Sequence, residues 1–470
     1  MLNSFIIGLE NTNTKKTLIE LNKNKIINII GCLTHNKNNL DIPNQFIEQD
    51  LYKIQNSFIQ NDPLSLKIYK ENNFILENLM KRVSIYKINK LETKKFYLSL
   101  LNLFLNFFKK NKIKFSFFDS TPHFPIQFII YLVSKYLKNK TIIFHRTDIS
   151  DVYILKKSIS ASSKILVNLN IKNNQKLIDQ YLDEKNISIW QIRSSILNKR
   201  SLNKNKSNYL LAILILIEIS IKTVYGQIFQ LKGKMESIFF YKNIPFLKKI
   251  YLKISFIIKY QYINFYLNKV SIDPNLDSKF IYFALHFQPE RSTMPEGGIF
   301  SDQFNAIKVL SKAADSQTLI YVKEHPRQID LYPDLRRLNF RSIKFYKKIM
   351  NLKNVKFIKT SYPSDVLVTR SLINSTITGS IGSDSIRKKQ PVIIFSEAWY
   401  SNSSFCKVVS NIKDCKKAIS YFSNKKIIDD SHFKISLSKY LIKLNNNNSS
   451  NSINKNNLYS ALHKLLFKPK

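Results

Sequence analysis

The chain has 470 residues and a mass of 55.2 kDa, with 44% hydrophobic residues, 13% aromatic residues and a formal net charge of +42. The hydrophobic content excludes a wholly disordered chain, and only 8 Gly and 13 Pro exclude a collagen-like repeat. Cys32, Cys406 and Cys415 form no CxxC pair and have no His at ligand spacing, so neither a zinc site nor a disulfide scaffold is expected. This length is typical of two or three domains.

The positive charge is mostly lysine, because only 11 of the 74 basic residues are Arg. Lys, Asn, Ile, Tyr and Phe have AT-rich codons, so an AT-rich genome explains the charge without a polyanionic partner. No RNA-binding or zinc-finger signature is present, and we expect no nucleic-acid partner. Against this background the Arg and Gly residues are informative. Seven of the 11 Arg and four of the 8 Gly lie between residues 291 and 387, which indicates an anion site there.

In chain order, the first half alternates apolar runs typical of strands with periodic segments typical of helices. Strands are predicted at residues 25–34, 114–118, 141–144 and 164–169, and helices within 40–115 and at 126–137. This alternation predicts a parallel α/β sheet. We assign residues 1–200 to a first Rossmann-like domain.

The middle of the chain, residues 201–275, is predicted to be a helical linker or insertion. Its longest apolar run, residues 209–217, is too short to cross a bilayer, which takes roughly 20 apolar residues. The N-terminus shows no basic region followed by an apolar run, so no signal peptide is predicted. We therefore expect a cytoplasmic protein, with peripheral contact to the inner membrane through the lysine- and aromatic-rich residues 242–260.

The second half repeats the alternation of strands and helices. Strands are predicted at residues 279–285, 318–322, 356–358, 373–377 and 391–395, and helices at 302–313 and 383–389. They predict a second Rossmann-like domain over residues 276–430, followed by a low-complexity tail with a terminal helix over 431–470. The predicted fold class is α/β, with two Rossmann-like domains, a helical middle segment and a ligand cleft between the halves.

A first group of polar residues follows the predicted strand 279–285. These residues are His286, Gln288, Glu290 and Arg291. Ligands bind at the carboxyl ends of parallel strands, and Gly297 and Gly298 would let a backbone approach closely. Asp302 is predicted to cap the helix that follows. The alternative is an ordinary strand–loop–helix connection.

A second group ends the predicted strand 318–322. It comprises Lys323, Glu324, His325, Pro326 and Arg327. An imidazole at His325 can donate a hydrogen bond to a phosphate or to a leaving nucleotide. Lys323 and Arg327 add positive charge.

A third group follows the predicted strand 373–377. It comprises Thr378, Gly379, Ser380, Gly382 and Ser383. Backbone amides and hydroxyls at a helix N-terminus form an anion site. The segment matches neither a GxGxxG fingerprint nor a P-loop. The alternative is a simple helix cap by Ser383.

Together the three groups resemble the capsular polysaccharide biosynthesis glycosyltransferases, a bacterial family of Kdo- and sialic-acid-type transferases with two Rossmann domains in the GT-B architecture. The matching residues are 285–290, 295–303, 323–326 and 378–385. The resemblance covers roughly residues 265–400, and it reaches the first half only through residues 119–123.

The resemblance implies a GT-B glycosyltransferase that moves a CMP-activated acidic sugar to a glycan or lipid-linked glycan acceptor, with inversion and without a metal ion. It implies no cofactor beyond the nucleotide-sugar substrate. His325 is the predicted catalytic group that stabilises the leaving nucleotide, and Arg291 or Arg327 would bind the sugar carboxylate. The predicted donor-binding residues are Gln288, Glu290, Arg291, Lys323, Glu324, Pro326, Arg327, Thr378, Gly379, Ser380, Gly382 and Ser383.

A transferase also needs a general base for the acceptor hydroxyl, and the architecture places it in the first, acceptor-side domain. Asp119 and His123, on the loop after the predicted strand 114–118, are our first prediction for this catalytic role. Residues 145–148 are the second choice, and Asp119 has the alternative of a simple turn residue.

Two other functions fit the same pattern. One is a different nucleotide-sugar enzyme, either a transferase with a UDP donor or an epimerase. The other is a non-catalytic factor of capsule assembly or export.

Overall fold

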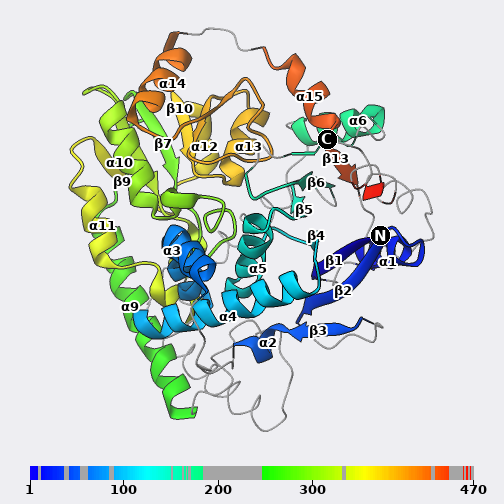
Figure 1. Cartoon of the computed structure of the whole chain (residues 1–470). Helices are drawn as coiled ribbons and strands as arrows, with labels where there is room; N and C mark the ends of the chain where they lie inside the picture. The colour runs from blue at the N-terminus through cyan, green and yellow to red at the C-terminus, as the bar shows by residue number, and fades with distance from the viewer. Residues whose placement is uncertain are drawn as a thin grey trace. The chain divides into compact units, whose positions relative to one another are not determined.

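Figure 1 shows the computed structural model of the chain. It describes residues 1–8, 12–35, 42–52, 62–83, 89–149, 152–160, 164, 165, 167, 171–183, 246–330, 335–424, 429–443, 459, 462, 463 and 466. The chain forms two compact units. The first comprises Met1–Met80, Ile88–Gln180 and Ser431–Lys470, and the second comprises Lys81–Lys87 and Tyr181–Asp430.

The first unit is built on a mostly parallel sheet. Its strands, over the described residues, are β1 (Leu2–Ile7), β2 (Ile27–Thr34), β3 (Asn44–Ile47), β4 (Phe115–Phe118), β5 (Lys140–Arg146), β6 (Val152–Lys156) and β13 (Leu441–Lys443). They lie in the order β13-β6-β5-β4-β1-β2-β3. Pairing is parallel from β3 to β5, and β6 is antiparallel to both of its neighbours. The strand order reverses between β1 and β4, which makes their carboxyl ends a topological switch point.

Helices cover both faces of the first sheet. They are α1 (Thr12–Lys23), α2 (Glu48–Leu51), α3 (Pro63–Val83), α4 (Lys90–Lys110), α5 (Pro125–Tyr136), α6 (Ile171–Leu182) and α15 (Ser431–Ser438). Helix α4 begins at a side-chain cap, where Asn89 accepts from the Leu91 amide, and α5 begins with Pro125 in its first turn. On one face, Phe5 of β1 packs against Phe104 and Phe108 of α4. On the other, α1 packs against the sheet through its buried leucines.

The second unit is built on a fully parallel sheet. Its strands are β7 (Phe280–Ala284), β8 (Leu319–Lys323), β9 (Val355–Ile358), β10 (Ile373–Thr376), β11 (Val392–Ile394) and β12 (Cys406–Val408). They lie in the order β12-β11-β10-β7-β8-β9, with every pair parallel. Here the order reverses between β7 and β10, so the second switch point lies at their carboxyl ends.

Two layers of helices enclose this sheet, as expected for strands that are apolar on both faces. The helices are α9 (Phe246–Val270), α10 (Gln303–Ala313), α11 (Ile343–Met350), α12 (Ser364–Arg370), α13 (Ser380–Arg387) and α14 (Ile412–Asn424). Short 3-10 turns are η2 (Gly298–Ser301), η3 (Pro326–Gln328) and η4 (Leu335–Asn339). Helices α9, α10, α11 and α14 pack on one face, whereas α12 and α13, side by side in Figure 1, cover the other.

The predicted fold class is confirmed, because both halves contain a mostly parallel α/β sheet. Of the helical middle segment, the structure describes α9, and the apolar run 209–217 lies outside the described residues. Asp302 caps α10 as predicted, through a bond from the Phe304 amide. None of the described helices combines the length and apolar character needed to cross a bilayer.

Several local predictions differ from the structure. Strands β1, β3, β6, β12 and β13 were not expected, and β13 places part of the predicted tail in the first sheet. The predicted strand at 164–169 is reduced, in its described part, to one bridge between Lys164 and Lys156. Helix α13 begins at Ser380 rather than at residue 383. Its cap position is therefore Gly379, and Ser383 lies inside the helix, so the simple cap by Ser383 is wrong.

Candidate functional site

The carboxyl edge of the second sheet brings the three polar groups together. His286 lies two residues beyond β7 and reaches the segment that follows β10. Its Nε2 atom accepts from the Thr376 hydroxyl at 2.8 Å and from the amides of Ile377 and Thr378 at 3.3 and 3.4 Å. The first and third groups therefore meet at the β7–β10 switch point, where ligands of such sheets bind.

These contacts define the tautomer of His286. Because Nε2 accepts two amide hydrogens, the ring hydrogen must lie on Nδ1. Nδ1 lies 3.2 Å from Glu290 Oε2 and 3.3 Å from Ser292 Oγ. Desolvation acts to raise the pKa of Glu290, but the hydrogen bonds from His286 and Ser292 and the charges of the nearby histidines together outweigh it and leave the pKa below its ordinary value. Glu290 is thus a half-exposed carboxylate held by the buried His286 ring.

Gly379 is required by this contact. A Cβ atom at Gly379 would lie 2.8 Å from Thr376 Oγ1 and 2.9 Å from His286 Cε1, closer than real side chains approach. As the N-cap residue of α13, Gly379 provides no side-chain hydrogen bond to the first amides of the helix. The exposed Ser380 follows directly. This leaves the N-terminus of α13 open to an anion.

The second group contains a buried ion pair. Glu324 is 1% exposed and accepts from Arg341 Nε at 2.7 Å, from the Tyr346 hydroxyl at 2.8 Å and from the His325 amide at 2.8 Å. Burial would lower the pKa of Arg341, but the Glu324 carboxylate holds it above its ordinary value. Arg341 Nη2 also donates to the His286 carbonyl at 3.0 Å. Glu324 and Arg341 therefore connect the ends of β7 and β8.

The His325 ring lies next to the Glu324–Arg341 pair and offers its Nε2 atom as a hydrogen-bond donor. Its Nδ1 accepts from the Arg327 amide at 3.2 Å, so in the neutral ring Nε2 carries the hydrogen. Desolvation lowers the pKa of His325 to about 4, although Glu290 and Glu324 oppose this. The half-buried ring packs against Phe287, with centroids 5.8 Å apart. At neutral pH this histidine is a neutral Nε2–H donor.

Lys323 is a buried cation. Its side chain is 3% exposed, and Nζ donates to Ser364 Oγ at 2.7 Å. Burial lowers its pKa to about 8. Within the described part of the chain, no carboxylate forms an ion pair with it. A buried ammonium without an opposite charge is costly, so a bound anion would stabilise it.

The other predicted donor-binding residues take varied positions. Gln288 is buried and bonds to Gln328 and Thr293. Arg291 lies 3.7 Å from Glu296, Arg327 is exposed over the Phe287 ring at 5.2 Å, and Thr378 donates to the Ser292 carbonyl. Pro326 begins η3, Gly382 packs against Tyr400, and Ser383 bonds within α13.

The carboxyl edge of the first sheet holds the predicted base. Gly8, which follows β1 with φ of +76°, lies so close to Asp119 that any Cβ atom there would overlap the carboxylate. Asp119 follows β4, so the pair marks the β1–β4 switch point. The first choice for the base therefore lies where this fold binds ligands.

Two histidines contact Thr121, two residues after Asp119. His123 Nδ1 lies 2.7 Å from the Thr121 carbonyl, which can only accept, so the neutral His123 ring keeps a lone pair on Nε2. His145 is 4% exposed and bonds to Thr121 Oγ1 at 3.2 Å. It lies within β5 rather than on a loop, which makes His145 the more enclosed of the two.

Sequence reasoning missed two sets of residues. Arg341 was counted among the clustered arginines but given no role, and Tyr346 was not considered, because their contacts with Glu324 cross 17 and 22 residues without a local motif. The second set is His35, which follows β2, and Glu48. Their Nδ1 and Oε2 atoms lie 2.9 Å apart, with Glu48 1% exposed. Only the position of His35 at the end of a predicted strand could have indicated it.

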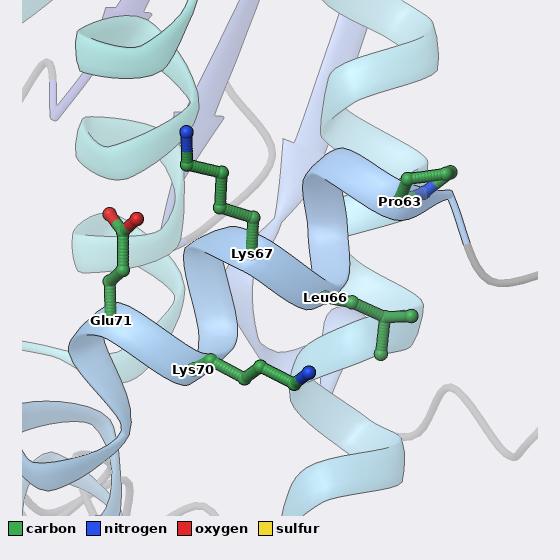
Figure 2. A pocket seen from close by; sticks show the side chains of 5 residues that line it. All are labelled: Pro63, Leu66, Lys67, Lys70 and Glu71. Atoms are coloured by element: carbon green, nitrogen blue, oxygen red, sulfur yellow. The ribbon is translucent and has the colours of Figure 1, made fainter.

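A surface hollow on α3 is separate from these residues. Figure 2 shows its lining, which is Pro63, Leu66, Lys67, Lys70 and Glu71. The side chains point in different directions, and Glu71 accepts a hydrogen bond from Tyr136 of α5. No predicted site residue lines the hollow. Among the described residues, no group of three His, Cys, Asp or Glu side chains is placed to hold a metal ion.

Several solved structures are similar to this chain at low identity. The Thermosulfurimonas dismutans KpsC β-Kdo 2,7 transferase is 10% identical with a TM-score of 0.31, covering 86% of this chain and 97% of the other. The KpsC β-Kdo 2,4 transferase of that organism is 13% identical with a TM-score of 0.24, covering 45% and 63%. The UDP-GlcNAc 2-epimerase of Methanocaldococcus jannaschii is 13% identical with a TM-score of 0.23, covering 92% and 95%.

A family model gives the more specific comparison. No curated protein matches the chain. Residues 259–407, which contain all three polar groups, match the family described as capsule polysaccharide biosynthesis protein. The family resemblance predicted from the motifs is therefore confirmed over residues 259–407, and this region of the chain is similar to the capsule polysaccharide biosynthesis proteins.

Proposed function

We propose that the chain is a glycosyltransferase of surface polysaccharide biosynthesis whose nucleotide-sugar donor binds at the carboxyl edge of the second sheet. The observation that supports this most directly is the neutral Nε2–H donor of His325. It shares a peptide segment with Lys323, a buried cation with no carboxylate partner among the described residues. A neutral N–H donor and a positive charge both suit the binding of a phosphate ester.

The donor phosphate is assigned to Lys323, His325 and the N-terminus of α13. Lys323 supplies the charge, His325 donates to the leaving phosphate oxygen, and the amides after Gly379 add dipoles directed at the anion. When the bond from the sugar to the phosphate breaks, negative charge grows on the leaving group, and these donors stabilise it. The sugar is proposed to be CMP-linked and acidic, with Arg327 or Arg291 binding its carboxylate.

Glu324 takes a different part from the direct donor contact first predicted. Its oxygens are occupied by Arg341, Tyr346 and the His325 amide. An anionic donor would also be repelled by a carboxylate. We therefore assign Glu324 to positioning: it fixes the backbone at His325 and joins it to His286 through Arg341.

The acceptor base is proposed to be His123 or Asp119 of the first unit. The bond from His123 Nδ1 to the Thr121 carbonyl leaves Nε2 as the basic atom, as a general base requires.

Transfer is proposed to be inverting and independent of metal. Activity that survives dialysis against EDTA supports metal independence, and activity lost and restored by Mg²⁺ contradicts it.

Thermal shift with free nucleotides tests the donor assignment. CMP should raise the melting temperature of the wild-type chain, because a ligand that binds only the folded state stabilises it. His325→Ala should lose this shift, whereas the exposed His432→Ala should keep it. A shift with UDP alone would favour the UDP-donor enzyme. No shift with any nucleotide would favour the non-catalytic assembly factor.

A further inference from the structure

Helix α9 carries two apolar faces. Its inward face is buried in the core of the second unit through Leu252, Phe256, Ile257, Tyr260, Ile263 and Leu267. Its outward face is formed by Leu247, Tyr251, Ile254, Ile258, Tyr262 and Phe265. These six residues recur every three or four positions, so they form one stripe along the helix, opposite to the buried face.

The outward stripe is open to solvent. Leu247 is 78% exposed and Phe265 is 68% exposed, and the other four residues range from 37% to 66%. A full aromatic side chain offers roughly 150–250 Å², so the three aromatic residues alone present on the order of 300–500 Å². That already equals the largest apolar patch of a typical monomer, about 300–600 Å². Figure 1 shows α9 along the edge of the second unit.

The charge on α9 is of one sign. The helix contains Lys248, Lys249, Lys253, Lys259 and Lys269 and no Asp or Glu. Lys248 and Lys269 lie near the two ends of the stripe, and both are exposed. A second copy of this helix would bring more lysines and no carboxylates to pair with them. An anionic surface complements both the lysines and the net charge of +42.

We propose that the outward stripe of α9 docks on the headgroup region of an anionic phospholipid bilayer, with the aromatic and aliphatic side chains inserted and the lysines against lipid phosphates. Helices that lie in a membrane interface combine an apolar face with Lys or Arg and often use Phe, Leu and aromatic anchors. The peripheral membrane contact predicted from residues 242–260 thereby acquires a defined surface. The proposal does not depend on the transferase function.

Vesicle flotation with the full chain tests this surface. The wild-type chain should float with phosphatidylglycerol–phosphatidylcholine vesicles and much less with pure phosphatidylcholine vesicles. The triple variant Ile258→Ser, Tyr262→Ser, Phe265→Ser should bind the anionic vesicles about tenfold or more weakly, because three inserted side chains are lost. Raising the salt concentration should weaken wild-type binding as well.

A matched control removes as many exposed apolar side chains elsewhere. Phe74, Leu91 and Ile435 are 44%, 59% and 48% exposed, and their combined change to Ser should leave flotation intact. Equal flotation of the α9 variant and the wild type would overturn the proposal. So would a wild-type dimer, seen by light scattering, that the α9 variant dissociates. If the triple variant does not fold, Phe265→Ser alone repeats the comparison.

Discussion

The carboxyl edges of the two sheets have the same topology but are held in different ways. In the second unit, His286, Glu324 and Arg341 join the ends of β7, β8 and β10 through buried, charged or fully bonded groups. In the first unit, the contacts described at the ends of β1, β4 and β5 include the close approach of Gly8 to Asp119, the bond from the Asp119 amide to the Ile7 carbonyl, and the bond between Thr121 and His145.

This difference indicates where geometry is fixed before a substrate arrives. Electrostatic stabilisation of a leaving group requires donors that are already oriented. At the second edge, Glu324 accepts from the His325 amide and so fixes the backbone of that donor. At the first edge, the pair of His35 and the buried Glu48 lies at the ends of β2 and β3, whereas the described bonds around Thr121 run through a hydroxyl and a carbonyl group.

Removing Arg341 should have the largest effect. Arg341→Ala leaves Glu324 as an uncompensated buried carboxylate, and such losses cost about 3–5 kcal/mol of the free energy of unfolding. This loss is measured by urea denaturation, from the transition in which the second unit unfolds. The exposed pair Lys359–Asp273 is the control, and Lys359→Ala should cost about 0–1 kcal/mol. A similarly small loss of stability for Arg341→Ala would contradict the idea that the Glu324–Arg341 pair holds the second edge in place.

His325→Ala should affect turnover more than stability. Loss of a preorganised donor to a leaving oxygen typically lowers kcat about 10²–10³-fold, whereas the half-buried ring contributes little packing. The measurement is turnover of a CMP-activated sugar, with the melting temperature checked in parallel. The exposed His432→Ala provides the control. Unchanged turnover would remove His325 from the mechanism, and a collapse of stability would make it a structural residue.

The sequence predicted the local parts of this picture well. Apolar runs located β2, β4, β5 and most strands of the second sheet, and the polar residues after β7, β8 and β10 were identified from strand ends alone. Parallel sheets bring such ends to one edge, so the convergence of the three groups followed from the fold.

Long-range partners were not accessible in the same way. His286 contacts Thr376, 90 residues away, and nothing near either residue indicates the pair. Short strands gave equally little signal. Strand β13 has three residues and pairs antiparallel at the sheet edge next to the low-complexity tail, so only its partner β6 defines it as a strand.

Gly379→Ala should lower the free energy of unfolding by about 1–3 kcal/mol, because the added methyl group overlaps His286 and Thr376 at the second edge. The affinity for CMP should fall together with the stability. Ser380→Ala, at the exposed neighbouring position, is the control and should leave stability within about 0.5 kcal/mol. Both are measured by urea unfolding and nucleotide titration. Wild-type stability of the Gly379→Ala variant would show that His286 can move.

Lys323→Met tests the buried cation through pH. The pKa of Lys323 is lowered by burial from 10.5 to about 8, so between these values the unfolded chain binds more protons and folding becomes more favourable as pH rises. Below pH 8 the folded chain bears the full cost of the charge. At pH 7 we therefore expect Lys323→Met to be more stable than wild type by roughly 1–3 kcal/mol. This advantage should shrink from pH 8 to pH 10.5. A pH-independent difference would contradict the assignment.

The smallest effect on stability is expected at the first edge. Thr121→Val removes the bond to His145 and keeps the shape of the side chain, so it should cost about 1 kcal/mol in urea unfolding. Ser120→Ala, at the neighbouring loop position, serves as the control.

The same Thr121→Val change leaves the carbonyl that orients His123 in place. A base at His123 should therefore survive it, whereas His123→Gln should lower kcat about 10²–10⁴-fold. A cost for Thr121→Val as large as that of Arg341→Ala would mean that the first edge is as rigid as the second, and the contrast between them would fail.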